Sequence, residues 1–265
     1  MNQHYLPQTY LKSFHISPKN GNVWIYNKKT KKIYYRPSKK IFSKKDFFTL
    51  HGAEEALKYY GEKISKDNNK YSMEQELQKM ESKIGRILKK LKEQGHIDQN
   101  EIKTIIEWAA WIHTVTNAVN NNNIQKLPNH QKTEILIDIF EKILPIFESK
   151  NWKIGIAEKK ENLFSSDKPI SLFDIKSLNN NINLSNALIS FPLTNKTLLI
   201  GSPAKKIQFL PCKPVPKEII LLANFLTYSQ SEKLVIINDK VEMENFLNYM
   251  LNGIQEKHKM APKQT

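Results

Sequence analysis

The chain contains little cysteine and glycine. Cys212 is its only cysteine, which excludes a disulfide framework and a zinc site built from clustered cysteines. Its eight glycines form neither a GxxxxGK[ST] nor a GxGxxG pattern, so both standard phosphate-binding glycine loops are excluded. The seven histidines never fall at HxxxH or HExxH spacing, which excludes a zincin site. No cofactor is evident; a divalent cation is possible, including at a site assembled from distant residues.

Long apolar runs are also missing. No segment approaches the roughly 18 apolar residues that a membrane-spanning helix needs. The start of the chain, MNQHYLPQTY, lacks the basic and apolar regions of a signal peptide. We therefore expect a cytoplasmic protein with no membrane partner.

Positive charge is abundant, but little of it is arginine. The formal net charge is +15, yet only Arg36 and Arg86 among the 41 basic residues are arginine. Arginine is the residue that phosphate and base recognition tends to recruit, so the total overstates the case for a nucleic-acid partner. The distribution is more informative. Residues 1–50 hold eleven basic residues and one acidic residue, Asp46, and thus +10 of the total.

Apolar periodicity predicts a mixture of helices and strands. Residues 22–37 read as a β-hairpin with a polar KKT loop, closed by Pro37. We expect the loops SSDKPIS (165–171) and SLNNNINLS (177–185), and a loop at the Asn run 120–123. The predicted helices are 6–14, 53–65, 72–95, 98–119, 130–149, 215–232 and 241–255; the further predicted strands are 151–158, 187–193, 196–202 and 233–238.

These elements predict an α+β fold, with one mixed sheet and a helical block of about 100 residues inserted between its strands. We expect a single domain over 1–265. Its expected parts are a basic helix and hairpin (1–50), the helical block (51–150), a strand-rich part with two helices (151–255) and a frayed tail (256–265).

Two polar groups are candidates for catalysis. His4 and Gln8 lie one turn apart if a helix includes both, so they could present a general base and a hydrogen-bonding amide; a lone histidine, however, more often packs or caps. Ser166 and Asp167 follow a predicted strand, and Asp167 could bind a metal or orient a base. A Ser-Asp-x-Pro turn in which the carboxylate accepts backbone N–H groups is the alternative.

Two further patterns each allow two interpretations. Glu74 and Glu81 lie one heptad apart on a predicted helix, with Glu76 between them, and could hold a cation or form a solvated helix edge. The hairpin interleaves aromatic rings with cations, as single-stranded nucleic acid binding requires, or it has one covered face and a solvated basic turn. Its candidate binding residues are Trp24, Tyr26, Lys28, Lys29, Lys31, Lys32, Tyr34 and Arg36.

The order of several segments resembles a bacterial family known only as domain of unknown function 4238. These segments are HYLPQTYLKSF, VWIY, DFFTL, MEQELQKMESK, SSDKP, SFPL and LLANFLTYSQSEKLVIIN. The resemblance spans nearly the whole chain and implies a bacterial origin, but no activity. It points to His4, Pro7, Tyr10, Leu11, Phe14, Ser166, Asp167 and Pro169, of which the apolar members and Tyr10 are explained as scaffold.

Two functions follow from these patterns as expectations. The first is an enzyme acting on nucleic acid or nucleotides, such as a nuclease-type effector of a defence or mobile-element locus. In it, His4 is the acid/base, Asp167 a metal ligand or orienting group, and Ser166 a hydrogen-bonding group. The second is a non-catalytic module that binds nucleic acid or an acidic partner through the hairpin.

Overall fold

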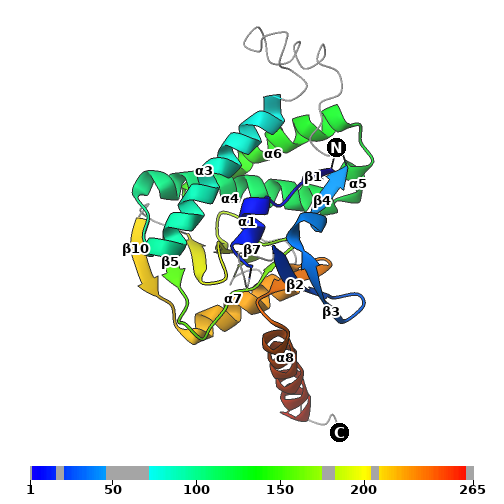
Figure 1. Ribbon diagram of the computed structural model, residues 1–265, viewed down its shortest axis with the longest axis vertical. Helices are drawn as coiled ribbons and strands as arrows, with labels where there is room; N and C mark the ends of the chain where they lie inside the picture. Colours follow the sequence, from blue (N-terminus) through cyan, green and yellow to red (C-terminus); the bar gives the residue numbers. More distant parts are fainter. Residues whose placement is uncertain (1, 16–20, 46–71, 175–182, 204–208, 261–265) are drawn as a thin grey trace.

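The structure, a computed structural model, describes residues 2–15, 21–45, 72–174, 183–203 and 209–260. It has an α+β fold, as predicted, with a layer of helices above two larger sheets (Figure 1). Its helices are α1 (Gln8–Lys12), η1 (Ser38–Lys40), α3 (Ser72–Gln94), α4 (Gln99–Asn120), α5 (Asn122–Gln125), α6 (Asn129–Glu148), α7 (Lys217–Gln230) and α8 (Lys240–Met260). Its strands are β1 (Asn2–His4), β2 (Asn22–Asn27), β3 (Lys32–Pro37), β4 (Ser43–Lys45), β5 (Asn151–Ile156), β6 (Ser165–Ser166), β7 (Ser171–Phe173), β8 (Leu188–Pro192), β9 (Thr197–Ser202), β10 (Phe209–Pro214) and β11 (Leu234–Ile237).

A four-stranded antiparallel sheet with the order β3-β2-β11-β6 joins a hairpin from the first 40 residues to two strands from the second half of the chain. The predicted hairpin is β2–β3, and β11 pairs with its inner strand, so that Ile236 lies opposite Ile25. Because β2 precedes the helical block and β11 follows it, strands from both sides of the block share one sheet, as expected.

The remaining strands form two more sheets rather than joining the first. One is a five-stranded mixed sheet, β10-β5-β9-β8-β7, in which only the β10–β5 pair is parallel; the other is the β1–β4 pair. The single sheet predicted from the sequence is therefore divided. The SSDKP loop marks the division, because β6 before it belongs to the four-stranded sheet and β7 after it to the five-stranded sheet. Pro169 has no N–H for a strand ladder, which favours the change of sheet at this loop.

The helical block is formed by α3, α4 and α6, close to their predicted bounds. A capping box starts α4: the Asp98 carboxylate accepts the N–H groups of Asn100 and Glu101, and the Glu101 side chain accepts the Asp98 N–H. Gly95, the predicted stop of α3, has φ +71°. Since α4 is buried along most of its length, it is the central helix of the block.

The main core joins the N-terminal segment to the helical block and both larger sheets. The Tyr10 ring lies 5.5 Å from Trp108 and 5.6 Å from Phe191 between ring centroids. Its hydroxyl donates to the Pro192 carbonyl (2.8 Å) and hydrogen-bonds to Ser165 Oγ (2.6 Å). The predicted scaffold role of Tyr10, Leu11 and Phe14 is confirmed, since all three are buried there.

Three local predictions differ from the structure or lie outside it. The short helix α5 forms in the Asn run predicted to be a loop, because the Asn121 side chain accepts the N–H groups of Asn123 and Ile124. α8 continues to Met260, past the expected end at 255. The predicted helix 53–65 lies outside the described residues. Among the helices that the structure describes, none is long and apolar enough to cross a membrane.

Candidate functional site

Asp167 fastens the turn that links α7 to β11 (residues 228–234, the α7–β11 turn). Its Oδ1 accepts the backbone N–H of Glu232 (3.0 Å), and its Oδ2 accepts those of Lys233 (2.8 Å) and Leu234 (3.3 Å). The backbone N–H of Asp167 also donates to the Leu234 carbonyl (3.1 Å). Both carboxylate oxygens are thus engaged by backbone donors, which come from a distant turn and not from the Ser-Asp-x-Pro turn itself.

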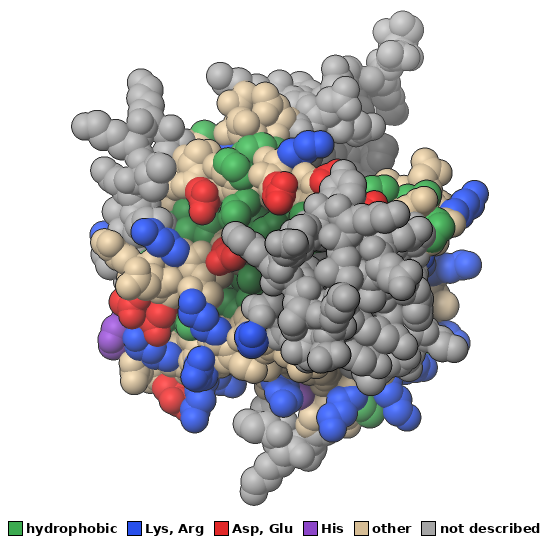
Figure 2. Space-filling view, turned by 90° about the horizontal axis from the view of Figure 1, so that it is seen from above, with side chains coloured by type: hydrophobic (Ala, Val, Ile, Leu, Met, Phe, Trp, Pro, Cys, Tyr) green, Lys and Arg blue, Asp and Glu red, His purple; other side chains and the backbone are tan. Residues whose placement is uncertain are grey.

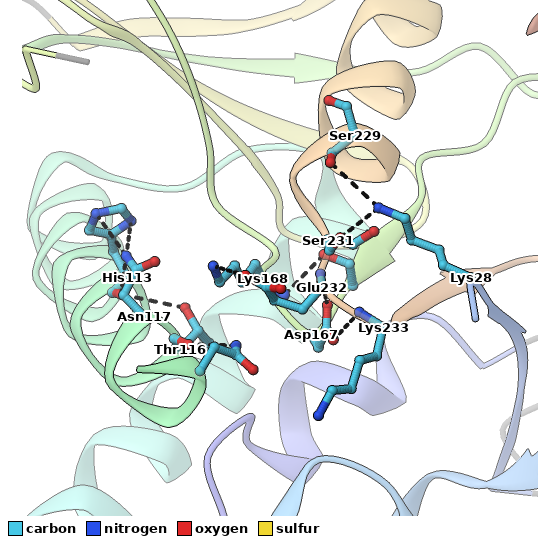
Figure 3. Close-up of polar contacts among 12 residues, drawn as sticks. Lys28, His113, Thr116, Asn117, Asp167, Lys168, Ser229, Ser231, Glu232 and Lys233 are labelled. Atoms are coloured by element: carbon cyan, nitrogen blue, oxygen red, sulfur yellow. Dashed lines mark hydrogen bonds and ion pairs between the residues drawn. The ribbon is translucent and has the colours of Figure 1, made fainter. Parts of the chain in front are cut away.

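Lys28 holds the same turn through its carbonyl groups. Its Nζ donates to the carbonyls of Ser231 (2.6 Å) and Tyr228 (2.8 Å), with a longer contact to Ser229 (3.5 Å). An ammonium group is favourable there, because the last carbonyls of α7 lack helical partners and carry partial negative charge. Figure 3 shows Lys28 and Asp167 both directed at this turn. Two candidates chosen from separate motifs therefore meet here, with backbone as their common partner.

The environment shifts the pKa values of both groups. Burial raises the pKa of Asp167, and its three backbone N–H bonds oppose that shift. Burial lowers the pKa of Lys28, while the carboxylates of Asp167 and Glu232 act in the opposite direction. Tyr5 is a further neighbour: burial, followed by the charge of Asp167, raises the pKa of its hydroxyl.

Two polar side chains of α4, His113 and Asn117, lie on the side of Lys168 away from this turn (Figure 3). The Lys168 ammonium pairs with Glu232 at 2.5 Å. The half-buried His113 ring lies 5.8 Å from Phe147 between ring centroids, and the Asn117 amide lies 3.2 Å from its Nε2. Burial, followed by the charge of Lys168, lowers the pKa of His113 to about 4. His113 is therefore neutral at pH 7.

This shift predicts the effect of acid on a His113→Gln variant. A histidine in the unfolded chain has a pKa near 6.5, so between pH 6.5 and pH 4 the unfolded state binds a proton that the folded state does not. The parent should lose stability as the pH falls through this window. At pH 5, the His113→Gln variant should retain about 1–2 kcal/mol of unfolding free energy that the parent loses to acid. Thermal unfolding at pH 7 and pH 5 measures this difference. The exposed His96, replaced by Gln, is the control; equal acid sensitivity of all three proteins would contradict the prediction.

The remaining catalytic candidates do not share one helix face. His4 lies in β1, opposite Ser43, and α1 begins only at Gln8, so the expectation of a helix carrying both residues is wrong. Pro7 explains the difference, because its conformation (φ −57°, ψ 141°) is extended and begins the helix after it. The His4 side chain lies outside the described part.

Gln8 and Ser166 bind neighbouring groups within the fold. The Gln8 amide donates to the Ser38 carbonyl (3.1 Å) and accepts from the Ser38 hydroxyl (3.2 Å), which joins α1 to η1. The buried Ser166 Oγ accepts the N–H of Lys168 (3.1 Å) and so closes the SSDKP turn. Both side chains therefore have structural partners.

Among the side chains that the structure describes, no group of three or more His, Cys, Asp or Glu could hold a metal ion. Burial raises the pKa of Glu81 to about 7. The side chains of Glu74 and Glu76 lie outside the described part.

The hairpin presents cations and rings together on its outer strand and loop. Arg36 lies 5.0 Å from the centroid of the Tyr34 ring, a cation–π arrangement. Tyr35 is 41% exposed, and its ring lies 4.8 Å from that of half-buried Trp24. The loop lysines Lys29, Lys31 and Lys32 are exposed, and none of the ion pairs recorded among the described residues includes them. The outer part of the hairpin that holds Lys29, Lys31, Lys32, Tyr34, Tyr35 and Arg36 is called the basic hairpin surface below; Tyr34 and Arg36 share one face of β3, and Tyr35 lies on the other.

Two of the predicted binding residues lie elsewhere. Tyr26 is 3% exposed, packed in the core cluster that holds Phe246 of α8. Lys28 is held by the α7–β11 turn, as described above. Positive charge is not confined to the hairpin either, since Lys and Arg side chains are scattered around the rim of the face in Figure 2. What distinguishes the hairpin is the combination of cations with the rings of half-buried Tyr34 and exposed Tyr35.

Sequence reasoning missed two lysines that fasten loops as Lys28 does. The buried Lys150 donates to the carbonyls of Leu184, Ser185 and Ala187 at 2.7–2.8 Å. Lys196 donates to those of Glu158, Lys159 and Glu161. Among so many lysines, neither position carries a signal that distinguishes it from a solvated one.

The chain matches a known family. The model of the family described as "Protein of unknown function (DUF4238)" matches residues 2–127 and 99–241. No curated protein and no solved structure matches the chain.

Proposed function

We propose, for a chain that belongs to the DUF4238 family, a cytoplasmic role as a nucleic-acid-binding module whose basic hairpin surface holds single-stranded RNA or DNA. The observation that carries the proposal is the Tyr34–Arg36 pair at 5.0 Å on the strand that follows the three exposed loop lysines. Ring faces stack bases whatever their identity, and lysines follow the phosphates. The surface therefore has both parts of a single-strand site.

The contacts that attach the hairpin to the rest of the fold support this role. β2 pairs with β11 through its last four residues, 24–27, and Lys28, directly after β2, is tied to the α7–β11 turn that Asp167 also holds. The strands that carry the lysine loop are thus held in place. Binding should therefore lose less conformational entropy. Lys28 acts in the proposal as a positioning residue, and its neighbour Lys29 as a binding residue.

Binding is favoured over the enzyme alternative by the partners of the proposed catalytic groups. Asp167 is engaged by three backbone N–H groups, Ser166 by a fourth and Gln8 by Ser38. A general base or metal ligand needs a free lone pair directed at substrate or metal, and these contacts use the groups for structure. A nuclease-type role in a defence or mobile-element locus remains the second candidate, resting on His4.

The test is a titration of labelled single-stranded RNA and DNA with the parent and a Lys29→Glu/Lys31→Glu/Lys32→Glu variant. The parent should bind with an affinity that falls steeply with salt. The variant should bind about 10–100-fold more weakly, with a log–log salt slope smaller by about 2, since each lost phosphate contact removes about 0.7. The control, Lys153→Glu/Lys159→Glu/Lys160→Glu, makes the same charge change at exposed positions outside the hairpin.

Equal weakening by the two triple variants would show only general charge attraction and would contradict a site on the hairpin. Binding by the parent that is flat with salt would contradict the electrostatic part of the proposal. Cleavage in the same incubations with Mg²⁺, lost in Asp167→Asn while the fold is retained, would favour the enzyme alternative instead.

A further inference from the structure

Arg36 is one of only two arginines among the 41 basic residues of the chain. Its guanidinium lies over the ring of Tyr34, 5.0 Å from the ring centroid, because alternate residues of β3 point to the same face. A guanidinium is a flat, delocalised group that stacks on other flat groups, whereas a lysine ammonium is a compact point charge. In this lysine-rich chain, the position therefore carries a cation with a property that lysine lacks.

The ring beneath Arg36 is held in place by the hairpin loop. The Tyr34 hydroxyl and Thr30 Oγ1 form a hydrogen bond of 3.2 Å. Thr30 is fixed in turn by Asn27, whose Oδ1 accepts the N–H groups of Thr30 (3.0 Å) and Lys29 (2.9 Å). The Tyr34 ring is thus oriented before any ligand arrives, which lowers the entropy cost of stacking on it or on the group above it.

The guanidinium of Arg36 is open to solvent. Arg36 is exposed, whereas Tyr34 beneath it is half-buried. In the part of the chain that the structure describes, the Tyr34 ring is its one recorded side-chain contact. On the other face of the hairpin, Tyr35 lies against Trp24 at 4.8 Å, and Trp24 packs on the cluster that holds Phe246 of α8. The group that the Tyr34 face offers to a ligand is therefore the guanidinium.

We propose that an unpaired base of the bound strand stacks on the outer side of the Arg36 guanidinium, so that Tyr34, Arg36 and the base form one stack. This inference rests on the proposed binding of single strands by the basic hairpin surface. Bases of a single strand are free to stack on guanidinium planes, whereas bases of a duplex are already stacked on one another. Arg36 is thus the residue that favours single strands over duplexes, while the loop lysines attract both.

Contact with a phosphate is the other role that an exposed arginine can have, since its donor fork matches phosphate oxygens. The two roles predict different ligand dependence. Phosphates are present in single strands, in duplexes and in strands from which the bases have been removed. Unpaired bases are present only in the first of these three. Comparing the three ligands therefore separates stacking from phosphate contact.

The test is a titration of parent and Arg36→Lys with a short labelled single strand, the same strand in a duplex, and an abasic strand of equal length. Arg36→Lys keeps the charge, so its salt dependence should equal that of the parent. It should bind the single strand about 5–10-fold more weakly, because the planar group is lost. Its affinity for the duplex and for the abasic strand should be unchanged. Arg86→Lys, at the other arginine, exposed on α3, is the matched control and should bind all three ligands like the parent.

Tyr34→Leu gives a second, independent readout. It removes the ring that supports the guanidinium and should weaken single-strand binding by a similar factor. Combined with Arg36→Lys, it should add little further loss, because both changes break the same stack.

Single-strand binding by Arg36→Lys equal to that of the parent would overturn this inference and leave the proposed function standing. Equal weakening on all three ligands would assign Arg36 to a phosphate and overturn the inference as well. A parent that binds none of the ligands would overturn the proposed function itself, and the inference with it.

Discussion

Replacing Asp167 by alanine is expected to lower the free energy of unfolding by about 3–5 kcal/mol. The carboxylate is 3% exposed and accepts three backbone N–H groups of the α7–β11 turn. Removing it leaves those donors without their partner in a buried turn, and hydrogen bonds to a charged group are among the stronger ones. Urea unfolding followed by circular dichroism measures the change.

Asp167→Asn separates shape from charge at the same position. The amide keeps one acceptor oxygen but turns an NH₂ group towards backbone donors, so we expect a loss of about 2–4 kcal/mol. The control is Asp138→Ala, at an exposed position of α6, which should change stability by less than about 0.5 kcal/mol. An Asp167→Ala variant as stable as the parent would show that the turn does not depend on the carboxylate.

Replacing Lys150 by methionine is expected to cost about 2–4 kcal/mol of stability. The side chain is 1% exposed, and its ammonium is the shared donor for three carbonyls of residues 184–187. Methionine retains an unbranched apolar stem, so the cost reports on the carbonyls left without a donor rather than on a large cavity.

Lys153→Met provides the comparison, because Lys153 lies three residues later on β5 and is exposed. Thermal unfolding should show a large loss for the first variant and almost none for the second. If both variants melt with the parent, the carbonyls of residues 184–187 find other donors, and Lys150 is not the residue that fastens this loop.

Periodic elements were predictable from the sequence, and contacts between distant turns were not. The hairpin β2–β3 and the helices α3, α4 and α6 follow from apolar spacing, Pro37 and Gly95. The short strands β6 and β7 do not, because two- and three-residue strands carry no measurable period. Their pairing in different sheets is what divides the predicted single sheet.

The candidate site was predictable at the level of motifs but not of partners. The SSDKP loop and the hairpin stand out by residue type, yet the sequence does not indicate that Asp167 and Lys28 fasten the same turn. The turn residues that Asp167 contacts lie 65 to 67 residues after it, and they contribute backbone groups, which have no residue-specific signature. Tyr26 shows the same limit, since its burial depends on the packing of α8.

The outer strand of the hairpin has one further consequence, which concerns solubility. β3 is an edge of its sheet, paired only with β2, and unpaired strand edges invite association with other chains. Here the edge begins at Lys32 and ends with Arg36 and Pro37, which repel or block an added strand. The residues proposed to hold nucleic acid thus also guard the protein against aggregation. Replacing the basic residues of this strand by glutamate keeps charge on the edge. Replacing them by neutral residues would leave Ile33, Tyr34 and Tyr35 on an edge without charge, where another strand could pair.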